Sequence, residues 1–93
     1  MKIVVNRCWG GFGLSEVAVE KYLALKGIKY DGHFYDGDIP RDDIDLVVVV
    51  EALDSASWGG FSHLEVVEIP DDIEWQIHDY DGMETIQEKH REW

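Results

Sequence analysis

The residues with the greatest potential for chemistry lie in a glycine-rich turn between an apolar N-terminal segment and the first expected helix. Backbone N–H groups in such a turn, close to the positive end of a helix dipole, can bind an anion. An arginine there can form two parallel hydrogen bonds with a phosphate, and aromatic rings can stack on a base or sugar. The candidate ligand-binding residues are Asn6, Arg7, Trp9, Gly10, Gly11, Phe12 and Gly13.

This glycine-rich turn (residues 6–13) follows neither standard nucleotide-binding pattern. No Gly-Lys-Ser/Thr follows it, as a P-loop requires, and its glycine spacing differs from the G-x-G-x-x-G fingerprint. The structural alternative is a tight turn in which Trp9 and Phe12 pack inward and Arg7 pairs with a surface acid. Both interpretations remain open on the sequence.

The C-terminal segment offers a second group of candidate ligand-binding residues, namely His90, Arg91 and Trp93. An imidazole, an arginine and an aromatic ring there could complete a pocket that the glycine-rich turn begins, within one chain or across a subunit interface. The alternatives are an amphipathic closing helix or an aromatic anchor in a subunit contact.

Catalytic, metal and cofactor sites are not expected. Cys8 with His78 or His90 is the simplest pair of nucleophile and base, and no spacing supports it. The histidines show no H-x-x-x-H or H-E-x-x-H arrangement, and the acids of residues 36–43 lack the spacing of an EF-hand loop. We therefore expect a binding protein and not an enzyme.

The composition is that of one small, strongly acidic globular domain (residues 1–93). Twenty acidic residues against eight basic ones give a net charge of −12, which argues against binding to nucleic acid or to an acidic membrane. The charge either serves solubility or forms an acidic surface for a basic protein. A single cysteine and the lack of a signal-peptide pattern indicate a cytoplasmic protein, and the small core favours a homo-oligomer.

Hydrophobic periodicity predicts an α/β (α+β) fold, with a small mixed sheet, a hairpin in the C-terminal half and two to three covering helices. Residues 2–7 predict a strand. A helix follows, for which Ser15 provides the N-cap and Gly27 the stop. We expect a short strand over residues 28–30 and a loop over residues 31–38.

The second half of the chain contains one ambiguous segment. Residues 46–50 alone suggest a buried strand, but the acids before them and the pattern after them favour a helix. Residues 63–69 and 73–80 predict two strands, and the short turn-rich connector between them predicts that they pair as an antiparallel hairpin. Residues 83–93 predict a closing helix.

The tetrapeptide Trp-Gly-Gly-Phe occurs twice, at residues 9–12 and at residues 58–61. The flanks of the two segments differ, because the first precedes an expected helix and the second an expected strand. Two occurrences are too few for a repeat architecture. We interpret the recurrence as a coincidence of two aromatic-flanked glycine turns.

Both ends of the chain resemble small uncharacterised proteins of tailed bacteriophages and prophages. The resemblance rests on the N-R-C-aromatic-G-G-F start within residues 2–15, on residues 66–82, and on the E-K-H-R-x-W end at residues 88–93. Residues 29–63 carry none of it. The family has no settled biochemical role, so the resemblance implies a phage context more than an activity.

In that context the protein would work in the cytosol of a host bacterium, where small phage proteins often act against host defence. One hypothesis is a ligand-binding protein that sequesters a phosphate-bearing nucleotide signal, with Asn6, Arg7 and Arg91 on the anion. The alternative is an acidic protein-interaction inhibitor, which binds a basic host protein and takes no small ligand. Both are analogies to other phage proteins.

Overall fold

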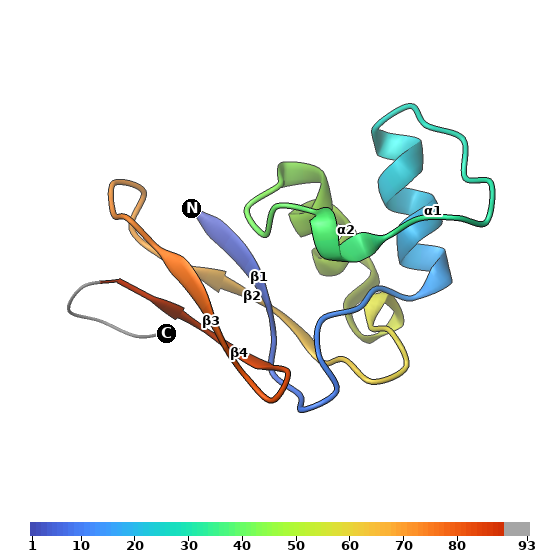
Figure 1. The fold of residues 1–93 in the computed structure, drawn as a ribbon. Helices are drawn as coiled ribbons and strands as arrows, with labels where there is room; N and C mark the ends of the chain where they lie inside the picture. The colour runs from blue at the N-terminus through green and yellow to red at the C-terminus, as the bar shows by residue number, and fades with distance from the viewer. Residues whose placement is uncertain (89–93) are drawn as a thin grey trace.

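The computed structural model describes residues 1–88 and contains two α-helices and four strands in that range. The strands form two antiparallel sheets, β1–β2 and β3–β4, so the predicted α+β class is confirmed (Figure 1). Two short 3₁₀ helices, η1 and η2, complete the secondary structure of this range. The bounds are β1 Lys2–Asn6, α1 Glu16–Leu25, η1 Asp36–Asp38, α2 Ile44–Leu53, η2 Asp54–Ser57, β2 Leu64–Glu68, β3 Gln76–Tyr80 and β4 Met83–Gln87.

The elements form three layers, with the β1–β2 sheet in the middle (Figure 1). Val4 of β1 packs on one side with the core that α1 and α2 contribute. Ile3 and Val5 pack on the other side with Ile86 of β4. Because β1 is covered on both faces, its apolar residues form a continuous run and do not alternate with polar ones.

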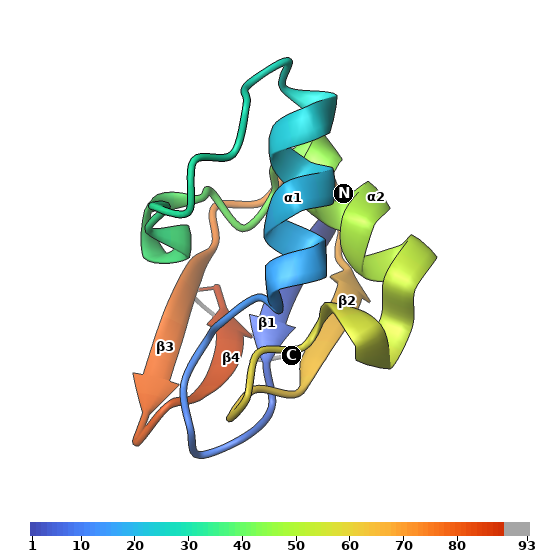
Figure 2. The ribbon, with the colours of Figure 1, turned by 90° about the vertical axis from the view of Figure 1, so that its right-hand side faces the viewer.

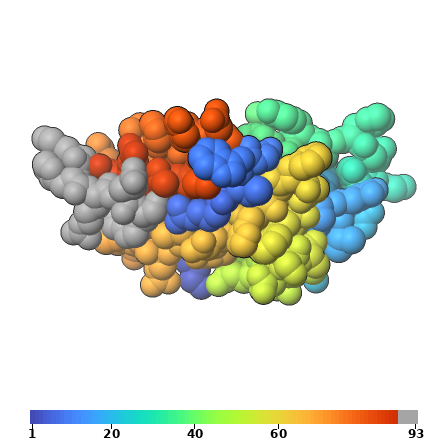
Figure 3. Space-filling model, turned by 90° about the horizontal axis from the view of Figure 1, so that it is seen from below, coloured from blue at the N-terminus to red at the C-terminus, as the bar shows by residue number. Residues whose placement is uncertain are grey.

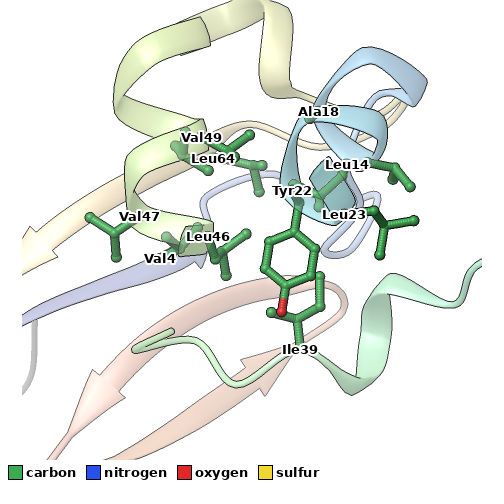
Figure 4. Close-up of a cluster of buried hydrophobic side chains, with 12 residues drawn as sticks. Val4, Leu14, Ala18, Tyr22, Leu23, Ile39, Leu46, Val47, Val49 and Leu64 are labelled. Atoms are coloured by element: carbon green, nitrogen blue, oxygen red, sulfur yellow. The ribbon is translucent and has the colours of Figure 1, made fainter. Parts of the chain in front are cut away.

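The larger core lies between the helices and the β1–β2 sheet. Figure 4 shows Tyr22 and Ala18 of α1 facing Leu46 and Val49 of α2, with Leu64 of β2 among them. The two helices lie side by side over this sheet (Figure 2). In residues 1–88 neither helix has the length and apolar character needed to cross a membrane.

Helix α1 begins and ends where the sequence predicts. The Ser15 Oγ accepts a hydrogen bond from the Ala18 N–H at 3.2 Å, which satisfies one of the unpaired amides of the first turn. The last helical residue is Leu25, and Gly27 follows with a φ of 74°. A positive φ at this position favours glycine, so Gly27 stops the helix as predicted.

Helix α2 confirms the helical interpretation of the valine-rich segment and excludes the strand alternative. Asp43 caps it, because one carboxylate oxygen accepts the N–H groups of Asp45 and Leu46. The same carboxylate accepts the Tyr22 hydroxyl at 2.9 Å and pairs with Lys26, so it also joins α2 to α1. Burial alone would raise the pKa of Asp43, but the hydrogen bonds from Lys26, Tyr22 and the backbone outweigh it and lower that pKa.

The predicted hairpin of residues 63–69 and 73–80 is wrong, although both segments contain a strand. β2 pairs with β1, with Val4 opposite Val66, and β3 pairs with β4. The connector after β2 leads from the first sheet to the second. The observed hairpin consists of β3 and β4, and its turn contains Asp81 and Gly82. Both residues have positive φ, as a type I′ turn requires.

Two further predictions are corrected. The closing helix of residues 83–93 is wrong for its first five residues, which form strand β4 because Glu84 and Ile86 alternate inward with period two. Glu88 is not helical either, and residues 89–93 lie outside the described part of the chain. Residues 28–30 do not form a strand, whereas residues 31–38 form the predicted loop and end in η1.

Candidate functional site

Asn6 is fully buried at the end of β1, and its side chain is used within the fold. The Nδ2 group donates to the carbonyls of Cys8 and Gly82 at 2.6 Å each. The Oδ1 atom accepts the backbone N–H of His63 at 2.9 Å and that of Cys8 at 3.3 Å. These bonds use both amide hydrogens and both acceptor lone pairs. Asn6 therefore joins three segments, and all of its hydrogen-bonding capacity is taken.

Arg7 lies between two acceptors of the chain itself. Its Nε atom pairs with the Glu65 carboxylate at 3.4 Å, and one terminal nitrogen donates to the Glu84 carbonyl at 3.0 Å. The pairing of Arg7 with an acid agrees with one part of the structural alternative, whereas Trp9, which that alternative packs inward, is exposed. A phosphate at the glycine-rich turn would compete with both acceptors for this guanidinium.

A carboxylate of the chain already lies beside the start of α1. The Asp36 Oδ2 atom, in η1, accepts the Leu14 N–H at 2.8 Å. The next amides belong to the capped first turn of α1, which begins at Glu16. A helix start after a glycine-rich turn attracts an anion. At Leu14 that anion is the Asp36 carboxylate of the chain itself.

An ion pair under the glycine-rich turn was not predicted from the sequence. Glu84 is only 3% exposed and forms two contacts with the Arg41 guanidinium, of which the Nη2–Oε2 contact is 2.7 Å. The Glu84 carboxylate also accepts the Asn6 N–H at 2.8 Å, and the Arg41 carbonyl accepts the Val4 N–H at 2.9 Å. The pair thus satisfies backbone groups along the edge of β1 that β2 does not cover. The one sequence signal for this ion pair was the spacing of Glu84 and Ile86, because residues two apart in a strand face the same side.

The Arg41 guanidinium also covers Phe12, with its central carbon 3.7 Å from the ring centroid. Phe12 is partly buried and also packs against the larger core. A cation over an aromatic face is attracted by the quadrupole of the ring. Phe12 is therefore held inside the fold, whereas Trp9 in the same turn is 57% exposed.

The second Trp-Gly-Gly-Phe segment packs directly against the glycine-rich turn. The Gly59 N–H and the Ser62 hydroxyl both donate to the Gly13 carbonyl, at 2.9 Å and 2.7 Å. A Cβ atom on Gly10 would lie 2.3 Å from the Cβ of Phe61, so these two segments touch closely. The two Trp-Gly-Gly-Phe segments are therefore in contact in the fold.

Three exposed aromatic residues lie on the turns that come together here. Trp9 and Tyr80 lie edge to face with ring centroids 5.8 Å apart, and Phe61 adjoins Gly10. The exposed fractions are 57% for Trp9, 80% for Phe61 and 66% for Tyr80. Figure 3 shows the glycine-rich turn in blue between the orange and red β3–β4 hairpin and the yellow segment around residue 60. We call Trp9, Phe61 and Tyr80 the aromatic tip.

Exposed acidic residues lie close to two segments of the aromatic tip. Asp79 and Asp81 flank Tyr80 in the chain, and Glu65, at the start of β2, pairs with Arg7. Asp79 additionally accepts the Gly82 N–H at 2.8 Å, which fixes the β3–β4 turn. The tip therefore has exposed rings next to a turn that carries two carboxylates.

The remaining predicted site residues do not join this arrangement in the described structure. His90, Arg91 and Trp93 lie outside residues 1–88. Gly11 has a φ of 89°, and a Cβ atom there would meet nothing within 4 Å. Among residues 1–88, no group of three or more His, Cys, Asp or Glu side chains is arranged to hold a metal ion.

Comparison with protein-family models, with curated proteins and with solved structures finds no match to this chain. The resemblance to small phage proteins therefore stays a prediction. So do the cytoplasmic location and the homo-oligomeric state.

Proposed function

We propose that the protein acts by binding another protein through the aromatic tip, and that its negative charge selects a basic partner. One observation carries the proposal: Trp9 and Tyr80 pack edge to face while both are exposed, and the exposed Phe61, from a third segment, lies next to Gly10 of the same turn. Exposed aromatic clusters with a polar rim are typical of protein interfaces. Tryptophan and tyrosine are also enriched among the residues that contribute most to binding energy.

The scaffold under the aromatic tip supports the same proposal. Asn6 ties together the glycine-rich turn, the β3–β4 turn and the segment before β2. The buried pair of Arg41 and Glu84 holds Phe12 and the end of β1 beneath them. A surface that is already ordered loses little conformational entropy when a partner binds.

The negative charge of the chain favours a basic partner. The net charge is −12, and Glu65, Asp79 and Asp81 lie close to two segments of the tip. Complementary charge accelerates association and disfavours partners of like charge. The resemblance to phage proteins would make the partner a host protein, such as one of the defence apparatus, with the chain as its acidic inhibitor.

The geometry favours this function over the capture of a phosphate-bearing nucleotide. Asn6 and Arg7, which the ligand hypothesis places on the anion, already bond to atoms of the chain. Calorimetry with a panel of adenine nucleotides and cyclic nucleotides separates the two functions. Protein docking predicts no heat; binding heat that disappears in Arg7→Ala would favour the nucleotide ligand.

The direct test is affinity capture from bacterial lysate, followed by measurement of each captured protein in purified form. The variant is Trp9→Ala with Phe61→Ala, and the matched control is Tyr35→Ala, which removes an exposed aromatic ring of the loop before α2. Two interface anchors at about 2 kcal/mol each or more predict a loss of affinity of roughly 1,000-fold or greater. The control should retain full affinity, and affinity should fall as ionic strength rises.

Equal binding by the tip variant and the wild type would contradict the aromatic tip as the docking surface. Binding that is insensitive to salt would contradict the role of the charge. The two parts of the proposal are therefore tested separately.

A further inference from the structure

Helix α2 exposes apolar side chains on the face that points away from the core. Ile44 is 78% exposed and Val48 is 45% exposed, and Ala52 continues the same line of residues one turn further. Positions four apart on a helix lie one above the other. We call Ile44, Val48 and Ala52 the α2 ridge.

The residues of the α2 ridge belong to neither of the two hydrophobic cores. Leu46, Val47, Val49 and Val50 bury the opposite faces of the helix. A helix that is apolar all round is normally buried on every side. Exposed β-branched residues do not favour helix formation either, because they lose side-chain freedom there. We therefore expect another molecule to cover the ridge.

A groove runs between the α2 ridge and the first two residues of the chain. Its volume is about 540 Å³, with Met1 and Lys2 on one side and Ile44 and Val48 on the other. Val47, which is almost fully buried, also lines it. The groove is thus mainly apolar and lies beside a straight ridge.

The cations along the groove are already paired with acids of the chain. Asp42 and Glu51 line it together with Lys2 and Met1, and the N-terminal ammonium of Met1 pairs with Asp71. The Lys2 ammonium already pairs with Glu51 at 3.0 Å, and this contact raises the pKa of Lys2. A second copy would bring the same two acids and a further charge of −12. Charge complementarity therefore favours a basic occupant over a second copy.

We infer that this groove binds an amphipathic helix of a partner protein, whose apolar stripe packs on the α2 ridge and whose Lys or Arg side chains pair with Asp42 and Glu51. Residues at i, i+4 and i+8 form the type of ridge that fits between the side chains of a second helix, at a crossing angle of about −50°. Recognition of an amphipathic helix by an apolar groove is a recurrent binding mode.

This inference does not depend on the aromatic tip. Lys2 begins β1 and Asn6 ends it, so the groove and the tip lie toward opposite ends of that strand. Loss of one docking surface should leave the other intact. Their tests therefore have separate outcomes.

The test uses a model Leu–Lys peptide whose leucines follow helical spacing, and a scrambled peptide of the same composition as the charge control. Calorimetry should show binding of the first peptide, and amide NMR shifts should centre on α2. Ile44→Ala with Val48→Ala should weaken binding by about tenfold or more. Alanine favours helices, so this variant should remain folded. Val17→Ala, at an exposed valine of α1, is the matched control and should bind as the wild type does.

Three results would overturn the inference. Equal affinity for the scrambled peptide would show attraction by charge alone. Unchanged affinity in the double alanine variant would show that the peptide lies elsewhere. Sedimentation of the wild type as a dimer that the same variant dissociates, with no peptide binding, would show that a second copy covers the ridge.

Discussion

In the first Trp-Gly-Gly-Phe segment the tryptophan faces solvent and the phenylalanine packs inward, whereas the second segment has the reverse arrangement. Trp9 is 57% exposed, and Phe12 lies between the core and the Arg41 guanidinium. Trp58 is half-buried and stacks on His63 with ring centroids 4.0 Å apart, and Phe61 is 80% exposed. The two exposed rings then lie on the same part of the surface.

The contrast shows that the surroundings, and not the four residues, decide which ring is buried. Phe12 has a cation over its ring and packs against the larger core, and a buried carboxylate holds that cation in place. Phe61 has the backbone of Gly10 beside it and no core of its own. A glycine pair allows the chain to turn either ring outward, because it imposes few steric limits on the backbone.

The largest loss of stability should come from breaking the buried Arg41–Glu84 pair beneath the first Trp-Gly-Gly-Phe segment. Glu84→Ala leaves the Arg41 guanidinium without its carboxylate, and breaking a buried ion pair in this way costs about 3–5 kcal/mol. Urea denaturation should show this loss, and Phe12 should become exposed with it. Glu65→Ala is the matched control, because it removes the exposed carboxylate that pairs with Arg7, and such pairs contribute about 0–1 kcal/mol.

Similar losses for Glu84→Ala and Glu65→Ala would contradict the role given to the buried pair. If Glu84→Ala does not fold, Glu84→Gln serves in its place. The amide is isosteric and retains an oxygen that can accept the Asn6 N–H, but it lacks the charge that balances Arg41. It should fold and still be less stable than Glu65→Gln.

The next effect concerns the contact between the two segments. A Cβ atom on Gly10 would lie 2.1 Å from the Phe61 carbonyl oxygen, so Gly10→Ala must push the backbones apart. Overpacking of this kind costs about 1–3 kcal/mol, and it should also weaken binding at the aromatic tip. Gly13→Ala is the control, because its Cβ would meet nothing within 4 Å. A stability loss in Gly13→Ala equal to that in Gly10→Ala would count against the packing of the two segments.

A smaller difference in stability should distinguish alanine substitutions at Gly11 and Gly60, which occupy the same place in the two segments. Gly11 has a φ of 89°, whereas Gly60, at the same place in its segment, is not among the glycines with positive φ. An alanine in the left-handed region costs about 1–2 kcal/mol, so Gly11→Ala should lower the free energy of unfolding by that amount. Gly60→Ala should stay within about 0.5 kcal/mol of the wild type. Equal values for the two variants would mean that both segments share one backbone conformation.

Local signals in the sequence were enough to find most elements of the fold. The Ser15 cap, the Gly27 stop and the acids before the valine-rich segment placed both helices correctly. The pairing of strands failed because the choice of partner depends on contacts between distant residues. The Asp81-Gly82 turn is a strong local hairpin signal, and greater weight on it would have predicted β4 in place of a helix.

The candidate site was predictable only in part. The sequence singled out the glycine-rich turn and gave Arg7 an acidic partner as one alternative. The roles of Asn6 and Glu84 depend on segments that are brought together by the fold, such as Gly82 and Arg41. The aromatic tip joins three such segments, so no spacing along the chain could have indicated it.

The smallest effect should distinguish the two tryptophans themselves. Trp58 Nε1 is buried, and it has no hydrogen-bond partner within residues 1–88. An unpaired buried donor costs about 1–3 kcal/mol, so Trp58→Phe removes an unfavourable group along with favourable apolar contact. The two changes oppose each other, and the net change in the free energy of unfolding should be under about 1 kcal/mol. Trp9→Phe at the exposed position should change it by less than about 0.5 kcal/mol. Fluorescence difference spectra against the wild type should show blue-shifted emission, protected from iodide, for Trp58 and quenchable emission for Trp9. Equal quenching of both would contradict the opposite burial of the two rings.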